Sequence, residues 1–410
     1  GIFTDEPNIE VQGNNNIRWT PDLFAVFQER WGYDLRTNLP SLFEETGDWK
    51  KVRHNYYQVL LQLFIDRWSK PWYAYTEEKK LEWTGHYWEH GWPNPNHGGD
   101  NMAMYAWHQR PGIDMLFNQF DEVSPNAQFG NIRAVKELSS VANQMGRERT
   151  LSETYGGGGW ELTFEDMKRL GDWQYVLGVN SLNQHLSYMS IVGARKYDYP
   201  QSFSHHSPWW PYYKPLNKYF ARLSLALSAG KQVNDILILE PTTAAWMYST
   251  FQQANPKRQE IGQRFQAFIT QLEKEQIEYD LGSENIIKDH GSVGKEGFTV
   301  GQRSYTKVII PPGMENLDER TATLLLEFLQ NGGEVIVLEE VKYVDGAISK
   351  ERVNGINAKL AGNLTDHTQL IEKLRSKEIS FIKENNASGK LYHQRRRFAD
   401  GELLFMVNSS

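Results

Sequence analysis

Short aliphatic runs alternate with longer amphipathic segments along the chain after residue 230. An unbroken apolar run bounded by turn residues indicates a strand buried on both faces, whereas apolar residues at helical spacing indicate a helix. The predicted strands are Asp235–Glu240, Ile277–Asp280, Lys307–Ile310 and Glu334–Leu338, and the predicted helices are 257–276 and 318–330. Strands in alternation with helices predict a doubly wound parallel sheet of the flavodoxin/amidotransferase-like kind.

The first 230 residues alternate on a larger scale, with long, aromatic and polar loops after the strands. The predicted strands are Ile2–Thr4, Leu81–His86, Arg149–Ser152 and Tyr175–Asn180, and the predicted helices are Pro21–Gly32 (with Thr20 as N-cap), 49–78, 133–145 and 163–174. This order predicts an α/β fold, namely the later strands of a (β/α)8 TIM-type barrel. In that fold the chemistry takes place where the strands end and the following loops begin.

The last 25 residues have a third pattern, apolar alternation on both sides of the turn Ala399-Asp400-Gly401, which predicts a hairpin. We therefore divide the chain into the C-terminal portion of a catalytic barrel (1–230), a doubly wound α/β domain (231–385) and the start of a β-sandwich-like domain (386–410). The chain begins and ends inside predicted strands, so we expect it to be a piece of a longer protein. Because half a barrel has unpaired strand edges, we expect residues 1–410 to aggregate on their own.

Composition excludes several classes of protein. The 410 residues include no cysteine, which excludes thiol catalysis, disulfides and cysteine-bound metals. The net charge of −7 offers no binding surface for a nucleic-acid backbone. No apolar run approaches the roughly 18 residues of a membrane span. Thirteen of the fourteen tryptophans lie at or before residue 210, so the aromatic excess belongs to the predicted barrel.

Two glutamates follow predicted strands of the barrel. Glu6 follows Ile2–Thr4 and precedes Pro7, and Glu153 follows Arg149–Ser152 and precedes a run of four glycines. Two carboxylates at the ends of two strands can flank one bond, one as a general acid and the other as a nucleophile or as the base for a water. The competing interpretation is that each is a surface or salt-bridged glutamate.

The loops between these glutamates are rich in side chains that bind sugars. Histidine, tryptophan, aspartate and asparagine are packed into the 23 residues from Gly85 to Trp107. Sugar rings stack their CH faces on aromatic rings, and their hydroxyls need paired donors and acceptors. The competing interpretation is that these aromatics fill the space between barrel and helices. The side chains that we expect to line a sugar site are His86, Trp88, Asp100, Asn101, His185 and His205.

Metal and cofactor motifs are weak. His86 and His90 are four residues apart, and His205 and His206 are adjacent, but glycine and proline nearby indicate loops rather than a zinc-binding helix face. A Ca²⁺ site of carboxylate oxygens has no distinctive spacing, so the metal stays open and we expect no cofactor to be required for the chemistry. No glycine-rich nucleotide motif follows Asp235–Glu240, which favours a structural role for the second domain over a nucleotide- or flavin-dependent enzyme.

Several segments together resemble known glycosidases. Phe3–Pro7 resembles the acid/base strand end of clan A glycoside hydrolases, and Thr150–Glu153 resembles the later strand with the second carboxylate. Loops and elements over residues 1–340 resemble bacterial glycoside hydrolases of the α-L-rhamnosidase family 106 type, and the domain order is similar to family 42 β-galactosidases. The segments that carry this are Gly85-His-Tyr, Pro111–Asp114, Asn183–His185, His206–Trp210 and Tyr219–Ser224.

The resemblance implies a glycosidase that removes a terminal sugar from a plant-type or other complex polysaccharide, with Glu6 as general acid and Glu153 as its partner. Family 106 enzymes invert configuration and are assisted by calcium, whereas family 42 enzymes retain it. Asp5 stands where many clan A members have an asparagine that contacts the sugar, so it joins the predicted substrate-binding residues, together with Tyr155 and Trp209. The resemblance also implies a periplasmic or extracellular location.

Two alternatives stay open beside an α-L-rhamnosidase-like enzyme: a family 42-like retaining β-galactosidase, and a carbohydrate-binding protein on a barrel that has lost catalysis. If Glu6 and Glu153 lay on opposite faces, the enzyme interpretation would be wrong. The sequence leaves open the sugar, its anomer and linkage, and the oligomeric state.

Overall fold

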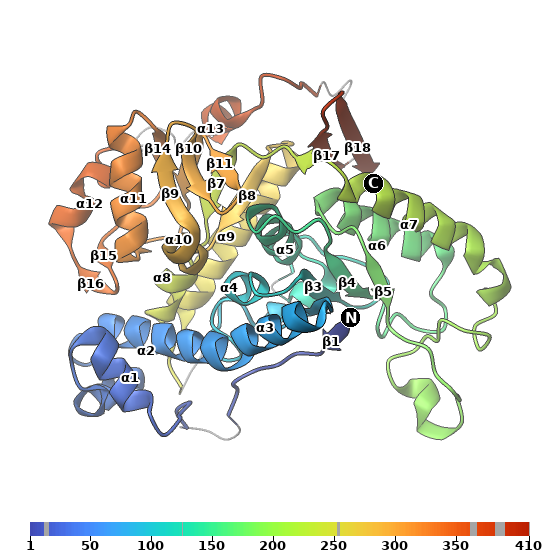
Figure 1. Cartoon of the computed structure of the whole chain (residues 1–410), viewed down its shortest axis with the longest axis horizontal. Coiled ribbons are helices and arrows are strands. Elements are labelled where there is room, and N and C mark those ends of the chain that lie inside the picture. The colour runs from blue at the N-terminus through green and yellow to red at the C-terminus, as the bar shows by residue number, and fades with distance from the viewer. Residues whose placement is uncertain (12–15, 125, 252–254, 361–366, 382–389, 410) are drawn as a thin grey trace.

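The computed structural model describes residues 1–11, 16–124, 126–251, 255–360, 367–381 and 390–409. The chain folds into an α/β protein in which two parallel sheets are the main strand-containing units (Figure 1). No helix in these ranges is both long and apolar enough to cross a membrane.

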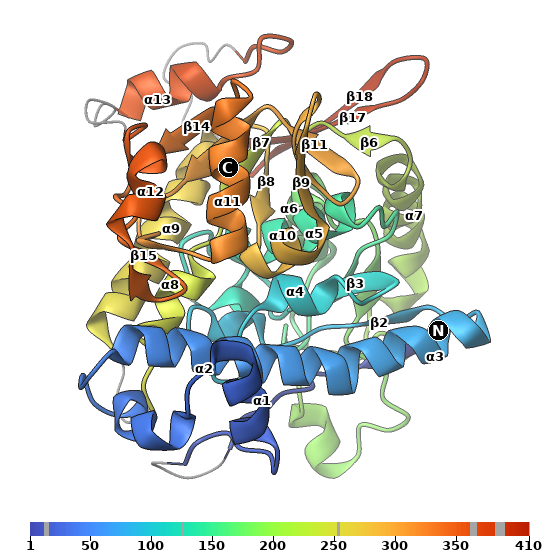
Figure 2. The same cartoon turned by 60° about the vertical axis from the view of Figure 1, so that its left-hand side comes forward.

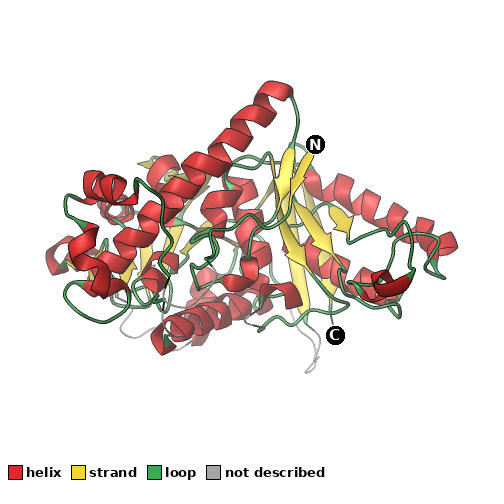
Figure 3. Ribbon diagram, turned by 90° about the horizontal axis from the view of Figure 1, so that it is seen from below, coloured by secondary structure: helices red, strands yellow, loops and turns green. Residues whose placement is uncertain are grey.

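The first sheet has five parallel strands in chain order. They are β1 (Ile2–Thr4), β2 (Trp83–Gly85), β3 (Arg110–Met115), β4 (Leu151–Thr154) and β5 (Leu182–Gln184). Seen from below, the strands lie next to one another with helices on both sides (Figure 3). An α/β half-barrel is thus confirmed, with all strand ends that carry the predicted carboxylates on one edge.

Glycines at two strand pairings allow this sheet to form. Gly85 on β2 pairs with Thr4 and has φ +134°, and a Cβ there would stand 2.0 Å from the Thr4 carbonyl oxygen. A Cβ on Gly112 of β3 would stand 2.6 Å from the Gly85 carbonyl oxygen. A side chain at either position would push neighbouring strands apart, so the close approach of β1, β2 and β3 requires glycine.

Three details of the sequence prediction differ from the structure. Tyr175–Asn180 was expected to be a strand, but residues 175–177 end a helix and the next strand is β5, two residues after Asn180. Gly178 stops that helix with φ +124°. Pro111–Asp114 was taken as a loop, yet it forms most of β3. The predicted helix Pro21–Gly32 begins two residues later, at Leu23.

The helices around the first sheet are α1 (Leu23–Trp31), α2 (Trp49–Phe64), α3 (Lys70–Lys79), α4 (Asn101–Tyr105), α5 (Ile132–Gln144), α6 (Phe164–Leu177) and α7 (Tyr213–Ser228). They include those predicted at 21–32, 49–78, 133–145 and 163–174, whereas α4 and α7 were not predicted. A π-helical segment, Ile65–Ser69, joins α2 to α3, so that 49–79 is one continuous rod (Figure 2). Pro71 is the second residue of α3, directly after this π-helical segment, and lacks the amide for a regular ladder, which accounts for the irregular turn before it.

The second sheet has four parallel strands in the order β14-β12-β7-β8. They are β7 (Ile236–Leu239), β8 (Tyr279–Gly282), β12 (Lys307–Ile310) and β14 (Glu334–Val337), and all four match predicted strands. The helices that connect or follow them are α8 (Thr242–Trp246), α9 (Pro256–Lys274), α10 (Glu284–His290), α11 (Glu319–Gln330), α12 (Lys350–Asn357) and α13 (His367–Leu374).

Three small sheets complete the described strands. An antiparallel sheet that was not predicted contains β9 (Gly291–Gly294), β10 (Gly297–Val300) and β11 (Arg303–Tyr305). Another contains β13 (Asn316–Leu317), β15 (Tyr343–Val344) and β16 (Ala347–Ile348). The predicted hairpin is present as β17 (Leu391–Arg397) and β18 (Glu402–Asn408), and β17 also pairs with β6 (Lys231–Gln232).

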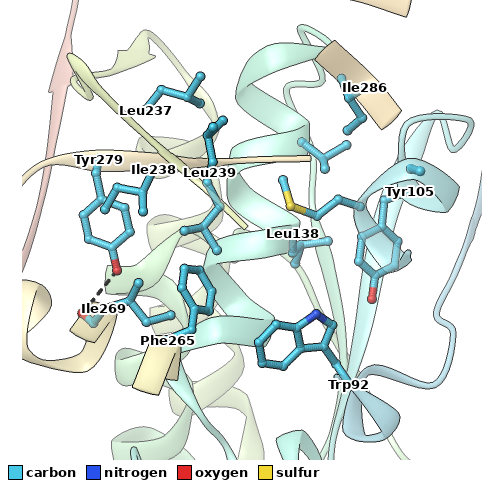
Figure 4. Packing of buried hydrophobic residues seen from close by; sticks show 14 of the residues in the cluster. Trp92, Tyr105, Leu138, Leu237, Ile238, Leu239, Phe265, Ile269, Tyr279 and Ile286 are labelled. Carbon is cyan, nitrogen blue, oxygen red and sulfur yellow. Dashed lines mark hydrogen bonds between the residues drawn. The ribbon is translucent and has the colours of Figure 1, made fainter. Parts of the chain in front are cut away.

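Helix α5 lies between the two parallel sheets, and all its residues except half-buried Asn143 are buried. Its apolar residue Leu138 belongs to the same cluster as Leu239 of β7 and Phe265 of α9 (Figure 4). Its polar residues bond to the second sheet: the Ser140 hydroxyl accepts from the Leu281 amide at 2.7 Å, and the Gln144 side-chain amide donates to the Leu281 carbonyl at 2.7 Å. One core therefore joins the two halves of the chain.

Candidate active site

Polar side chains gather where the five strands of the first sheet end. Glu6 lies two residues after β1, His86 directly after β2, Asp114 and Glu153 one residue before the ends of β3 and β4, and His185 directly after β5. The strands are parallel, and Asp114 pairs in register with Glu153. The sheet therefore carries all five groups to its carboxyl edge, where barrel enzymes place their chemistry.

The backbone turns sharply as it leaves these strands. Glu6 after β1, Phe117 after β3 and Tyr155 after β4 have φ values of +44°, +70° and +69°, and Gly85 at the end of β2 has φ +134°. Left-handed conformations are unfavourable for residues with a side chain and are concentrated at functional sites. The sheet edge thus holds its loops in specific strained turns rather than in relaxed ones.

His86 is the centre of the site. Its ring is buried, and Nε2 lies 3.0 Å from Glu153 Oε2 and 3.4 Å from Asp5 Oδ1. Burial opposes a charge on the ring, but the hydrogen bond to Glu153 and the charges of Glu89 and Asp114 outweigh it and raise the pKa of His86 to about 10. His86 is therefore an imidazolium at neutral pH and donates a charge-assisted hydrogen bond to Glu153.

Glu6 lies in the same cluster and is half-buried. Burial raises the pKa of its carboxyl group, the negative charges of Asp5 and Glu153 raise it further, and the positive charge of His86 acts in the opposite direction. A carboxyl group whose pKa is raised in this way keeps its proton closer to neutral pH, which is what a general acid requires. The second glutamate of the site, Glu153, accepts a hydrogen bond from the His86 imidazolium.

Asp114 is a functional candidate that the sequence prediction missed. It is buried, Gln128 Nε2 donates to its Oδ2 at 3.1 Å, and its Oδ1 has no hydrogen-bond partner among the described residues. Burial raises the pKa of Asp114 to about 7, with further contributions from Glu89 and Glu153 against His86. Recognising Pro111–Asp114 as a strand rather than a loop would have placed this residue at a strand end.

Glu89 is a second missed carboxylate, buried beneath His86. The Tyr87 amide donates to Glu89 Oε1 at 3.1 Å, and the Tyr105 hydroxyl donates to the same oxygen. Burial raises the pKa of Glu89 to about 7, while His86 lowers it. This carboxyl group faces His86 from the protein interior and adds to the field that keeps the imidazolium charged.

The structure brings some of the predicted substrate-binding residues to this cluster. His185 Nε2 lies 3.7 Å from Glu153 Oε1, and Asp5 is exposed beside His86. Trp88 lies two residues after His86 and stacks on His97 with ring centroids 4.4 Å apart, next to His90. His205 is exposed in the long loop after β5, with its ring beside that of His206.

Other predicted residues have packing or capping contacts instead. Asp100 is buried, caps α4, and accepts hydrogen bonds from Ser283 and Asn285 of the second half. Asn101 is the first residue of α4. The Tyr155 ring is buried, and its hydroxyl donates to the Met167 carbonyl at 2.8 Å. Trp209 packs against the rings of Phe164, Phe203 and Tyr213. A substrate contact by these four side chains stays a prediction.

Ligand atoms close enough together to hold a metal ion occur in three groups of the described residues. Two belong to the site, namely Asp5–His86–Glu153 and Glu6–His86–Asp114. The third, His54–Asp318–Asp345, lies where α2 meets α11, and there His54 and Gln58 donate to the Asp318 carboxylate. Because His86 is an imidazolium, only the carboxylates of the first two groups would bind a cation, and Asp114 Oδ1 is an acceptor there without a hydrogen-bond partner among the described residues.

A family model described as alpha-L-rhamnosidase, glycoside hydrolase family 106, matches residues 7–408. No curated protein matches the chain.

Solved structures share the fold. A rhamnosidase from Novosphingobium sp. PP1Y is 19% identical, with a TM-score of 0.67 over 95% of this chain and 38% of that one. An apo exo-carrageenase of family GH42 from Bacteroides ovatus is 11% identical, with a TM-score of 0.60 over 91% and 54%. A beta-galactosidase from Bacillus circulans sp. alkalophilus is 10% identical, with a TM-score of 0.51 over 98% and 65%. The chain thus spans less than two thirds of each of these proteins.

Proposed function

The chain belongs to the alpha-L-rhamnosidase family, glycoside hydrolase family 106, and from this premise we propose that it carries the catalytic carboxylates of an enzyme that hydrolyses terminal α-L-rhamnosides. The observation that supports this most directly is the meeting of Glu6 and Glu153 at one imidazolium, His86, at the carboxyl edge of the sheet. The same geometry disfavours a protein that only binds sugar, because binding alone does not need two carboxylates placed at one shared imidazolium.

In the proposed mechanism Glu6 donates its proton to the glycosidic oxygen as the bond to the leaving group breaks. The raised pKa of Glu6 keeps that proton available. Glu153, hydrogen-bonded to His86, takes a proton from the water that attacks the anomeric carbon, in keeping with inversion in family 106. Attack by Glu153 itself would be the retaining alternative.

His86 acts on Glu153 rather than on the sugar. Its ring is almost wholly buried, and its Nε2 is engaged by the carboxylates of Glu153 and Asp5. Its positive charge offsets the mutual repulsion of the carboxylates that surround it, namely Asp5, Glu6, Asp114 and Glu153. We therefore assign His86 as a positioning residue, not as a substrate-binding residue.

A Ca²⁺ ion fits the donor set of this edge. Calcium takes carboxylate oxygens, and the buried Asp114 Oδ1 is an acceptor without a hydrogen-bond partner among the described residues. Asp114, a carboxylate without a catalytic assignment, would contribute to holding the ion. When bound, it would supply positive charge and coordination sites for sugar hydroxyls.

We further propose that the half-barrel is part of a (β/α)8 barrel and that the second sheet is flavodoxin/amidotransferase-like. Read from β8, the second sheet has the strand order 2-1-3-4 in chain numbering, as in the flavodoxin type. The hairpin β17–β18 would begin a β-sandwich-like domain. The proposed substrate is a rhamnoside of a plant-type polysaccharide. The proposed location of the protein is outside the cytoplasm.

The test compares carboxylate variants of the protein that carries this chain on an aryl α-L-rhamnopyranoside. Glu6→Gln and Glu153→Gln are each expected to lower kcat/KM by about 10³-fold or more, since each removes a catalytic proton transfer. Glu161→Gln, in the loop after β4 and exposed, serves as the control. Near-normal turnover by both site variants would refute the assignment, and turnover only of an aryl β-D-galactoside would favour the family 42-like alternative.

A further inference from the structure

Three aromatic side chains beside the site have no part in the proposed mechanism. They are Phe117 after β3, Phe129 in the same loop, and Tyr199 in the loop after β5. We call them the rim rings. Phe117 and Phe129 are stacked, with ring centroids 4.8 Å apart and planes 14° apart. Tyr199 is 50% exposed and Phe129 38% exposed, so the rim rings present apolar surface to solvent.

The four glycines after Glu153 explain how these rings come together. A Cβ on Gly157 would stand 3.4 Å from both Phe117 Cε1 and Tyr199 Cδ1, so the two rings flank this glycine. Gly157 also has φ +70°, a conformation that glycine adopts without strain. A Cβ on Gly156 would touch His185 at 3.0 Å. The glycine run therefore lets the loop after β4 pass between the loops after β3 and β5.

Both ends of the rim touch residues of the site. The Tyr199 ring lies 5.7 Å from the His185 ring, and His185 Nε2 lies 3.7 Å from Glu153 Oε1. At the other end, Gln128 precedes Phe129 and donates to Asp114 Oδ2. Tyr199 thus adjoins Glu153 through His185, whereas Glu6 follows β1 at the other end of the strand order, although a carboxylate oxygen of Glu6 lies within 4.8 Å of one of Asp114.

This placement decides which part of a glycoside the rings meet. In the proposed function, Glu153 acts at the anomeric carbon, which belongs to the terminal sugar, and Glu6 acts at the oxygen of the leaving group. Pyranose rings stack an apolar CH face on aromatic side chains. We propose that the rim rings bind the apolar face of the terminal sugar and not the leaving group. This inference rests on the proposed function.

The experiment uses two substrates that share the terminal sugar, p-nitrophenyl α-L-rhamnopyranoside and α-L-rhamnosyl fluoride. The fluoride has no ring in its leaving group. Tyr199→Ala in the protein that carries this chain is expected to lower kcat/KM about tenfold on both substrates, mostly through KM, the size of one lost aromatic contact. Tyr199→Phe keeps the ring and is expected to stay within twofold of the wild type on both.

Tyr197→Ala is the matched control, because Tyr197 is exposed in the same loop and its ring meets only Lys196 among the ring contacts of the described residues. A loss confined to the p-nitrophenyl substrate would place the rim at the leaving group and overturn the inference. Unchanged kinetics of Tyr199→Ala on both substrates, with an unchanged thermal midpoint, would also overturn it. An inactive wild type would overturn the proposed function itself, and the inference with it.

Discussion

At the scale of single residues, the site depends on one positive charge among several negative ones. His86 donates to Glu153 and stands beside Asp5 and Glu6, with Glu89 beneath it. The negative charges of Asp5 and Glu153 raise the pKa of Glu6, and the imidazolium opposes that effect. The pKa of Glu6 is therefore raised first by its own burial and then adjusted by these charged neighbours.

This coupling predicts opposite shifts in the pH profile for two variants. The general acid must be protonated, so kcat/KM falls as the pH rises through the pKa of Glu6. Asp5→Asn removes a charge that raises this pKa and is expected to move the basic limb to lower pH. His86→Gln removes a charge that lowers it and is expected to move the same limb to higher pH, with a fall of about 10- to 100-fold in kcat from the lost hydrogen bond.

The measurement is the profile of kcat/KM against pH on an aryl α-L-rhamnoside. Glu10→Gln, exposed in the same segment and not among the groups that influence Glu6, is the control. Shifts of the same sign in the two variants would show that Glu6 does not control the basic limb.

At the scale of secondary-structure elements, the sequence predicted most helices and strands because their apolar patterns are local. Glu6, His86 and Glu153 could be identified as strand-end residues for that reason. Strand β3 was missed because proline and glycine at 111 and 112 argue against a strand, yet close approach to Gly85 requires the glycine. Asp114 was missed with it, since its role depends on a register that only the assembled sheet shows.

The local sequence pattern also failed to predict the surroundings of Asp100 and the helical conformation of residues 175–177. Asp100 was expected in the sugar site because aspartate binds hydroxyls, but its acceptors bind Ser283 and Asn285, far along the chain. The segment Tyr175–Asn180 was predicted to be a strand because it begins with three consecutive apolar residues. These residues form the buried last turn of α6 instead. Partners distant in sequence decided the case of Asp100.

Gly85→Ala is expected to lower the free energy of unfolding by about 4 kcal/mol, because the new Cβ would meet the Thr4 carbonyl at 2.0 Å at a backbone angle of +134°. Gly294→Ala is the matched control, since nothing lies within 4 Å of its Cβ position and its φ is not positive. Denaturant unfolding of both variants measures the difference. Equal stabilities would contradict the close pairing of β1 with β2.

At the scale of the whole molecule, α5 packs between the two parallel sheets and contacts both of them. Beyond its bonds to Leu281, Asn143 donates to Asp280 at 2.9 Å and Lys136 forms an ion pair with Glu273 at 3.1 Å. Separating the halves would break these interactions and expose the apolar side chains that α5 shares with the second sheet. The two sheets should therefore be stable only together.

We accordingly expect residues 1–230 and 231–410 to unfold in one cooperative transition. Scanning calorimetry of the protein that carries this chain should show no separate transition of either half. Gln144→Leu, which leaves the Leu281 carbonyl without its donor, should lower the midpoint of that shared transition. Two resolved peaks, with only one of them sensitive to Gln144→Leu, would contradict this expectation.

The burial of α5 on all sides also bears on how sequences of this family diverge. A helix that faces water on one side can exchange residues there with little effect, and most helices drift through such positions. Helix α5 has only the half-buried Asn143 there, since its lysine, its arginine and Ser140 have partners on neighbouring elements. We expect a comparison of homologous sequences to find the slowest-changing helical segment at 132–144, ahead of the helices that carry more apolar residues.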